Sequence, residues 1–187
     1  MTDEGYTRPL GAPLSEKETE RYFQRHELLI EFARLFDYKE ASDRAVAIIG
    51  PAFLDMLLSN ILIEFMIEDD KEVNKLLRPD GPLGTYGSRV TACYCLGLIG
   101  PIVTADLRLV GKIRNRFAHD IRASFSGQPI SQSCRALRWH REAMLREPPS
   151  EATDRDFFQV GVNQLVSYLT AVPGIARAKK RPKVLET

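Results

Sequence analysis

The stretch DRAVAIIGPAFLDMLLSNILIEFMI, residues 43–67, decides the fold, because apolar residues occupy nearly every side of the helix that it predicts. A helix that is apolar all round is packed among other helices. Pro51 removes one backbone hydrogen-bond donor, so we expect either a kink near Gly50-Pro51 or two abutting helices. The sequence therefore predicts a central helical segment around which the remaining helices assemble.

Helix start signals recur on both sides of this stretch. Ser15, with Glu18 three residues later, has the pattern of a capping box, and Asp69 and Asp70 open a short helix. The outer helices are predicted at 15–36, 69–77, 88–98, 104–119, 131–146 and 153–169. Either Thr85 or Ser88 is expected to cap the helix at 88–98. No segment alternates apolar and polar residues as strands do. The predicted fold class is all-α, a single-domain bundle of six or seven helices.

A chain of 187 residues fits one domain. Residues 1–13 contain glycines and prolines without helical periodicity, and we expect a flexible leader there. The helical domain is expected over residues 14–173, with its last helix ended by Pro173-Gly174. Residues 174–187 are expected to form a basic, disordered tail.

The composition is that of a globular protein in a reducing compartment. Hydrophobic residues make up 44% and charged residues 27%, which allows a packed core and excludes wholesale disorder. Three cysteines are too few for a disulfide scaffold, and no secretory signal is recognised, so we expect a cytoplasmic protein. Asp55 and Glu64 interrupt the longest apolar run, so no membrane segment is expected. Cys93 and Cys95 would diverge on a helix and only three histidines are present, so neither a metal nor another cofactor is expected.

The formal net charge of +1 conceals an asymmetry between the two halves of the chain. Residues 1–100 carry 11 Lys and Arg against 17 Asp and Glu, whereas residues 101–187 carry 15 against 8. The basic half either faces nucleic acid or distributes its cations over unrelated helix surfaces.

Two basic segments are candidates for nucleic-acid contact. Arg135, Arg138 and Arg141 are spaced to share one face of the helix predicted at 131–146. The run 177–183 could add nonspecific affinity for phosphates. A solvated helix face and a disordered tail are the alternative interpretations.

The segment KIRNRFAHD, residues 112–120, is the most suggestive of chemistry. Asn115 and His119 lie on nearly one line of a helix, whereas Arg114 points about 140° away from His119. His119 would act as acid or base while the arginines hold a phosphate. Alternatively, these groups bond the carbonyls at the end of the helix, where cations are favoured.

The loop 82–89 places Gly84 and Gly87 just before a helix and could present backbone N–H groups to an anion. It lacks the Gly-Lys-Ser/Thr ending of a P-loop. We expect instead a turn in which Tyr86 packs on the bundle and Arg89 pairs with Asp43 or Asp55.

Several motifs across about residues 30–140 follow the order of a known family. They are Ser42-Asp43-Arg44-Ala45, Phe53-Leu54-Asp55, the loop 81–89, Gly97-Leu98-Ile99 and the segment 112–119. Together they resemble the mannitol operon repressor family. The resemblance implies an all-helical bacterial cytoplasmic regulator of transcription in carbohydrate use, without a recognised DNA-binding motif. No helix-turn-helix is recognised in this sequence either, and the leader and the basic C-terminal segment do not map onto the family.

The spacing from Arg114 to His119, with Asn115 beside Arg114, also resembles the arginine-x4-histidine signature of HEPN domains. Many members of this group are metal-independent ribonucleases, and they often dimerise. By this resemblance His119 would assist attack by a ribose 2′-hydroxyl while Arg114 stabilises the phosphate across a dimer. Noncatalytic members exist, and the motif is short.

The leading interpretation is a noncatalytic transcriptional regulator that acts through protein–protein contacts and forms a homo-oligomer, with a dimer favoured. The alternative is a HEPN-like endoribonuclease in which Arg114, Asn115 and His119 are the catalytic residues. Direct DNA binding through the basic helix and tail is a third possibility.

Overall fold

The computed structural model describes residues 14–36, 41–144 and 149–184. Its helices are α1 (Glu16–Leu35), α2 (Asp43–Phe65), α3 (Asp70–Leu77), α4 (Tyr86–Cys95), α5 (Pro101–His119), α6 (Ile130–Arg135), α7 (Trp139–Met144) and α8 (Asp154–Ala178). No strand occurs among the described residues, and the helices form a single bundle. The predicted all-α class is therefore confirmed.

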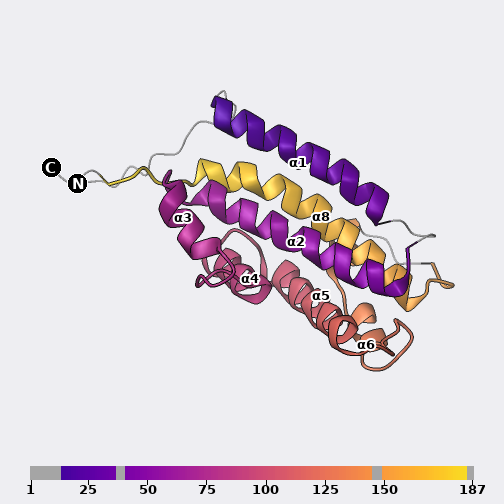
Figure 1. Ribbon diagram of the computed structural model, residues 1–187. Coiled ribbons are helices and arrows are strands. Elements are labelled where there is room, and N and C mark those ends of the chain that lie inside the picture. The colour runs from indigo at the N-terminus through magenta and orange to yellow at the C-terminus, as the bar shows by residue number, and fades with distance from the viewer. Residues whose placement is uncertain (1–13, 37–40, 145–148, 185–187) are drawn as a thin grey trace.

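The bundle is built around α2 and α8, which run side by side through its centre (Figure 1). α1 lies along one side of this pair, and α4, α5 and α6 lie along the other. Gly50 and Gly161 permit close approach within this core. A Cβ at Gly50 would lie 2.9 Å from a ring carbon of Phe36, and one at Gly161 would lie 2.7 Å from a methyl group of Leu137. Any larger residue at either position would force these neighbours apart.

The central stretch forms one helix, so of the two expected outcomes at Gly50-Pro51, a kink or two abutting helices, the second is excluded. Pro51 lies inside α2 and is buried. By length and composition alone, α2 is long and apolar enough to cross a membrane, despite Asp55 and Glu64. The expectation that these two residues exclude a membrane-spanning length is therefore wrong. More than half of its most apolar window is buried in the bundle, as in the core helix of a globular protein.

The predicted caps at the starts of α1, α3 and α4 are confirmed. Ser15 and Glu18 form a capping box, and Asp69 and Thr85 are N-caps. α5 begins at Pro101, three residues before the expected start at Thr104. Proline is well tolerated in the first turn of a helix, because the N–H that it lacks would have no partner there.

α8 continues to Ala178, so the expected end at Pro173-Gly174 is wrong. Pro173 is buried within the helix. One turn later the Arg177 guanidinium bonds Glu64 of α2 at 3.0 Å and Glu18 of α1 at 3.1 Å. The first residues of the expected basic tail therefore belong to the helical bundle.

The single basic helix predicted at 131–146 is also wrong, because the chain breaks between α6 and α7. Asp106 of α5 lies beneath the break and is 1% exposed. One of its carboxylate oxygens accepts the backbone N–H groups of Arg138 and Trp139, at 2.9 and 2.7 Å. A helix running through this point would direct those two donors to its own carbonyls instead.

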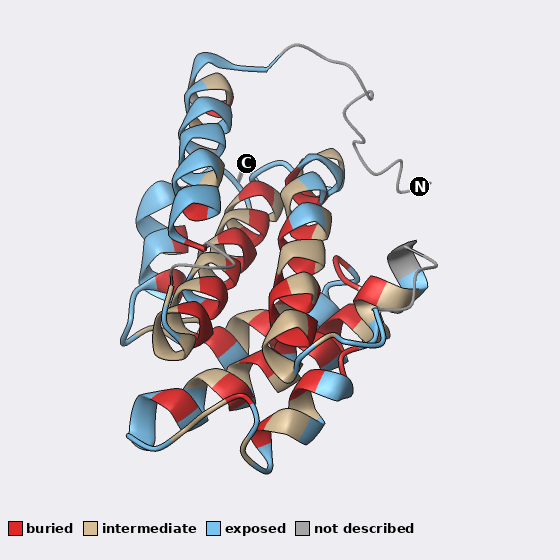
Figure 2. Cartoon of the chain, turned by 90° about the vertical axis from the view of Figure 1, so that its right-hand side faces the viewer, coloured by how far each residue is buried: buried red, intermediate tan, exposed pale blue. Residues whose placement is uncertain are grey.

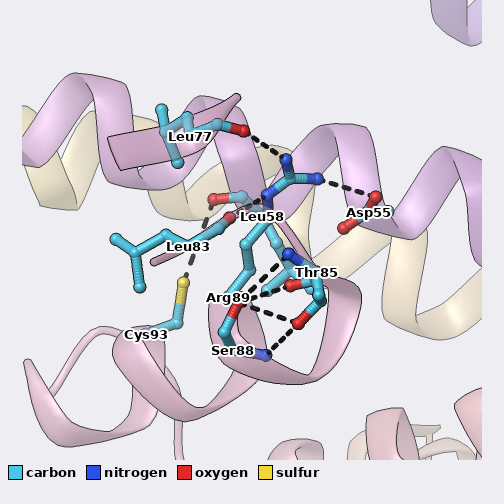
Figure 3. Close-up of polar contacts among 8 residues, drawn as sticks. All are labelled: Asp55, Leu58, Leu77, Leu83, Thr85, Ser88, Arg89 and Cys93. Atoms are coloured by element: carbon cyan, nitrogen blue, oxygen red, sulfur yellow. Dashed lines mark hydrogen bonds and ion pairs between the residues drawn. The ribbon is translucent and has the colours of Figure 1, made fainter. Parts of the chain in front are cut away.

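Arg89 of α4 secures the loop that leads into α4 (Figure 3). Its guanidinium bonds Asp55 of α2 at 2.7 Å and the carbonyls of Leu77 and Leu83 at 2.8 and 2.9 Å. The expected pairing with Asp55 is confirmed, whereas Asp43 pairs with Arg155 of α8 at 2.9 Å.

Tyr86 packs on the bundle as predicted. Its buried hydroxyl donates to the Leu107 carbonyl of α5 at 2.9 Å. This bond holds the start of α4 against the middle of α5, whereas the Arg89 contacts connect α4 to α2 and to the loop before α4.

Candidate functional site

Helix α5 presents one buried apolar face and one exposed basic face. The buried face carries residues at helical spacing, namely Val103, Leu107, Val110, Ile113 and Phe117. The exposed face carries Arg108, Lys112, Asn115, Arg116 and His119, which follow one another at i, i+4, i+7, i+8 and i+11. We call these five residues the basic α5 surface. The apolar periodicity that packs α5 into the core thus turns the cations outward.

Two hollows open along the basic α5 surface. The larger, of about 640 Å³, lies between the end of α5 and α6, and its lining includes Arg116, His119 and Ser133. The smaller, of about 370 Å³, lies between α5 and the start of α4 and is lined by Arg108 and Arg114. Lys112 and Asn115 border both hollows, so the two form adjoining parts of one surface.

Arg114 and His119 open onto different hollows within one chain. Arg114 is half-buried beside the start of α4, whereas His119 is exposed at the end of α5. This separation follows from their five-residue spacing on a helix. Asn115 and His119, one turn apart, share the larger hollow. A single chain therefore does not bring the three candidate catalytic residues into one site.

The cations beside these hollows are not neutralised by nearby acids. Within the described ranges, Arg108, Lys112, Arg114 and Arg116 form no ion pair with any carboxylate. Asp120 is the acidic group that lines the larger hollow, and its carboxylate accepts the backbone N–H of Arg122 at 2.9 Å. The surface therefore retains an excess of positive charge with which to attract an anionic group.

Arg44, at the start of α2, holds the end of α5 in place, a role that the sequence did not reveal. Its guanidinium donates to the carbonyl of Phe117, and at 3.0 Å to the carbonyls of Asp120 and Ile121. The last carbonyls of a helix need donors from outside the helix. The sequence has no glycine cap after His119, which indicates that the last carbonyls of this helix need other donors. No local sequence pattern, however, identifies a donor that lies 73 residues away.

The three arginines predicted to form one nucleic-acid-binding face are distributed differently. Arg135 pairs with Asp154 at 2.6 Å and lies 5.1 Å from the ring centre of Phe157. Arg141 lies 5.9 Å from the same ring. Arg138, the residue before α7, pairs with Glu142 of α7 at 3.1 Å. The break between α6 and α7 removes the continuous helix face on which their alignment depended.

The basic residues after α8 lie beside acidic residues at the junction of α2 and α3. Lys183 bonds Asp69 at 2.9 Å, and Lys180 lies 3.7 Å from Glu68. The hydrogen bond from Lys183 lowers the pKa of the Asp69 carboxyl below its ordinary value. These cations are therefore partly matched by neighbouring acids, unlike those of the basic α5 surface.

In the described part of the chain, no cluster of three or more His, Cys, Asp or Glu side chains could hold a metal ion. Cys93 is buried and Cys95 exposed, so the two diverge as their spacing predicted. Burial raises the pKa of the Cys93 and Cys134 thiols to about 12.

The structure is similar to that of MtlR in the X-ray structure of the MtlR–HPr complex from Escherichia coli. The match covers 80% of this chain and 99% of the MtlR chain, with a TM-score of 0.59 and 22% sequence identity. No protein-family model matches the chain, and no curated protein matches it significantly. The likeness to MtlR confirms, at the level of the fold, the resemblance that the sequence motifs indicate.

Proposed function

We propose that the chain is a noncatalytic regulator of transcription that acts by binding another protein. The observation that supports this proposal is the shared fold with MtlR, which was crystallised in complex with HPr. The motifs across residues 30–140 point to the same family. A protein of the HPr type is therefore the first partner to test.

We further propose that the partner contacts the basic α5 surface. Its cations are exposed, lack ion pairs in the described ranges and border two hollows of about 640 and 370 Å³. Such a surface favours a partner with carboxylate or phosphoryl groups, because complementary charge speeds association and selects between partners. Arg44 supports the contact indirectly, since it fixes the last turn of α5 on which Arg116 and His119 stand.

Calorimetric titration with HPr from the same organism tests both parts of the proposal. We expect the wild-type chain to bind and the double variant Lys112→Glu/Arg116→Glu to bind at least about tenfold more weakly, since the reversed charges repel an acidic partner. The control Lys71→Glu/Lys75→Glu makes the same change of charge on the exposed side of α3 and is expected to bind normally. No binding by the wild-type chain would contradict this partner, and undiminished binding by the α5 variant would contradict this surface.

Endoribonuclease activity is the second candidate function. It is favoured by the adjoining hollows, because Lys112 and Asn115 connect the section lined by Arg114 to the section lined by His119. A second copy of the chain would be needed to bring an Arg114 and a His119 together. The proposed function predicts no cleavage of single-stranded or structured RNA in the presence of EDTA. If the wild-type chain cleaves RNA and a folded His119→Ala variant does not, this result would contradict the noncatalytic function and support the endoribonuclease.

A further inference from the structure

The smaller hollow beside α5, of about 370 Å³, has an arginine on each side of a glycine. Arg108 precedes Gly111 by three residues and Arg114 follows it by three, and all three line the hollow. At about 100° per residue, the two arginines therefore stand about 60° to either side of the glycine. Because Gly111 has no side chain, the ring of Tyr86 packs on the helix backbone at this point. A Cβ there would lie 3.0 Å from a ring carbon.

Arg114 is half-buried, yet its guanidinium forms no hydrogen bond, ion pair or ring contact with another residue of the described ranges. Half-buried residues line the packed helices of the bundle (tan in Figure 2), where side chains find fewer water molecules. A guanidinium carries five N–H donors, and donors withdrawn from water need acceptors. The other half-buried arginines of the described chain all have such partners, namely Arg21, Arg44, Arg89, Arg141, Arg155 and Arg177.

The start of α4 lines the other side of the smaller hollow and adds further donors. The backbone N–H groups of Tyr86 and Gly87, in its first turn, have no acceptor among the described residues. Such first-turn groups favour an anion. Lys112 brings a third cation to the hollow, and no carboxylate from the described ranges lines it. Its lining therefore offers many donors and positive charge without any acid to balance them.

We propose that the smaller hollow binds a small molecule through a phosphate ester, which Arg108, Arg114 and Lys112 hold. A dianionic phosphoryl group supplies both the negative charge and the several acceptor oxygens that this lining calls for, and arginines bind phosphate with paired hydrogen bonds. The volume of about 370 Å³ lies within the range of small-molecule pockets and leaves room beside the phosphate. Tyr86 and Val90 supply an apolar wall for the remainder of the ligand.

This inference goes beyond the proposed function, because the ligand is a small molecule rather than a protein. Its test is also separate. Titration with HPr examines the basic α5 surface through Lys112 and Arg116, whereas the phosphate site is examined without HPr and with both of the residues changed in that experiment left intact in the diagnostic variants. Failure of either experiment therefore leaves the other unaffected.

Titration of the isotope-labelled full chain with glycerol 3-phosphate, followed by NMR, tests the inference. We expect the amides of Gly87 and Gly111 to shift to saturation, and unphosphorylated glycerol to cause no shift. Arg108→Gln/Arg114→Gln should raise the Kd at least about tenfold, because hydrogen bonds between charged groups are lost. The control Arg116→Gln/Arg122→Gln makes the same change of charge at two exposed positions outside the hollow and should bind normally.

A steric variant tests the position of the ligand without changing any charge. A Cβ at Gly87 meets no atom within 4 Å, so α4 accommodates Gly87→Leu, and the new side chain occupies part of the hollow. We expect it to weaken binding of glycerol 3-phosphate at least about tenfold. The control Gly174→Leu lies at an equally open, exposed position of α8 and should bind as the wild type does.

Three results would overturn the inference. They are the absence of saturable shifts in the wild-type chain, undiminished binding by Arg108→Gln/Arg114→Gln, and undiminished binding by Gly87→Leu. Titration with inorganic phosphate separates the two sources of the anion. Saturable binding of inorganic phosphate without binding of glycerol 3-phosphate would show that the hollow takes a free ion and excludes an ester.

Discussion

At the scale of single residues, the end of α5 depends on Arg44. Three carbonyl groups, those of Phe117, Asp120 and Ile121, accept hydrogen bonds from one guanidinium. The planar, multiply donating guanidinium suits this task, whereas a lysine would place a single ammonium there. His119 and Arg116 occupy the turn that these bonds hold in position.

We predict that Arg44→Ala lowers the free energy of unfolding by about 2–3 kcal/mol, because hydrogen bonds to charged groups are lost and carbonyls are left without donors. Urea unfolding followed by circular dichroism measures the change. Arg78→Ala, which removes an exposed ion pair with Asp80, serves as the control and should change the free energy by less than about 0.5 kcal/mol. Equal stability of Arg44→Ala and wild type would show that the end of α5 is held by other groups.

At the scale of elements, Asp106 determines where α6 ends and α7 begins. The buried carboxylate accepts the N–H groups of Arg138 and Trp139, which satisfies the donors at the start of a six-residue helix. This contact crosses 32 residues of sequence. It is also why the three arginines of the predicted basic helix do not share one continuous helix face.

We predict that Asp106→Ala destabilises the protein by about 2–4 kcal/mol, because two backbone N–H groups at a buried site lose their acceptor. Hydrogen exchange of the Arg138 and Trp139 amides should accelerate more than that of amides in α2. The control Asp120→Ala removes an exposed carboxylate that accepts one N–H bond, and it should cost less. Unchanged protection of the two amides would contradict the role of Asp106.

The same residue gives a pH dependence with a defined sign. Burial raises the pKa of the Asp106 carboxyl above its ordinary value of 3.8, against the opposing effect of the two N–H bonds. As the pH rises from 3.8, the unfolded chain releases this proton before the folded chain does. The stability of the wild type should therefore fall relative to that of Asp106→Asn over this window. A relative increase would contradict the raised pKa.

At the scale of the whole molecule, Arg177 connects three helices. It pairs with Glu18 of α1 and Glu64 of α2 from the last turn of α8, and the three side chains are 12%, 8% and 2% exposed. Because α1 contacts the bundle over a narrow face, this cluster and the Phe32–Phe53 stack account for much of its attachment.

We predict that Arg177→Met costs about 3–5 kcal/mol of stability, because the buried carboxylates of Glu18 and Glu64 lose their bonds to the guanidinium. The triple variant Arg177→Met/Glu18→Gln/Glu64→Gln also removes the two buried negative charges and should recover part of the loss. Thermal unfolding monitored by calorimetry compares the three proteins. If Arg177→Met is as stable as the wild type, the cluster contributes nothing to the attachment of α1.

The sequence by itself determined the fold class, the central helix and the caps at Ser15, Asp69 and Thr85. These follow from local interactions. The side chain of an N-cap residue accepts a hydrogen bond from the backbone N–H three residues later, and a helix buried in a bundle needs an apolar surface. The divergence of Arg114 from His119 also followed from sequence, because helical period fixes the angle between residues of one helix.

Only the tertiary structure decided the break between α6 and α7, the continuation of α8 past Pro173 and the support of α5 by Arg44. Each depends on a partner far along the chain: Asp106 for the break, Glu18 and Glu64 for the end of α8, and the carbonyls after Phe117 for Arg44. A spacing rule reaches about one helical turn, whereas these contacts form only once the packed helices bring distant donors and acceptors together. The basic character of α5 could therefore be predicted from the sequence. The two hollows beside its cations, in contrast, depend on how the helices pack together.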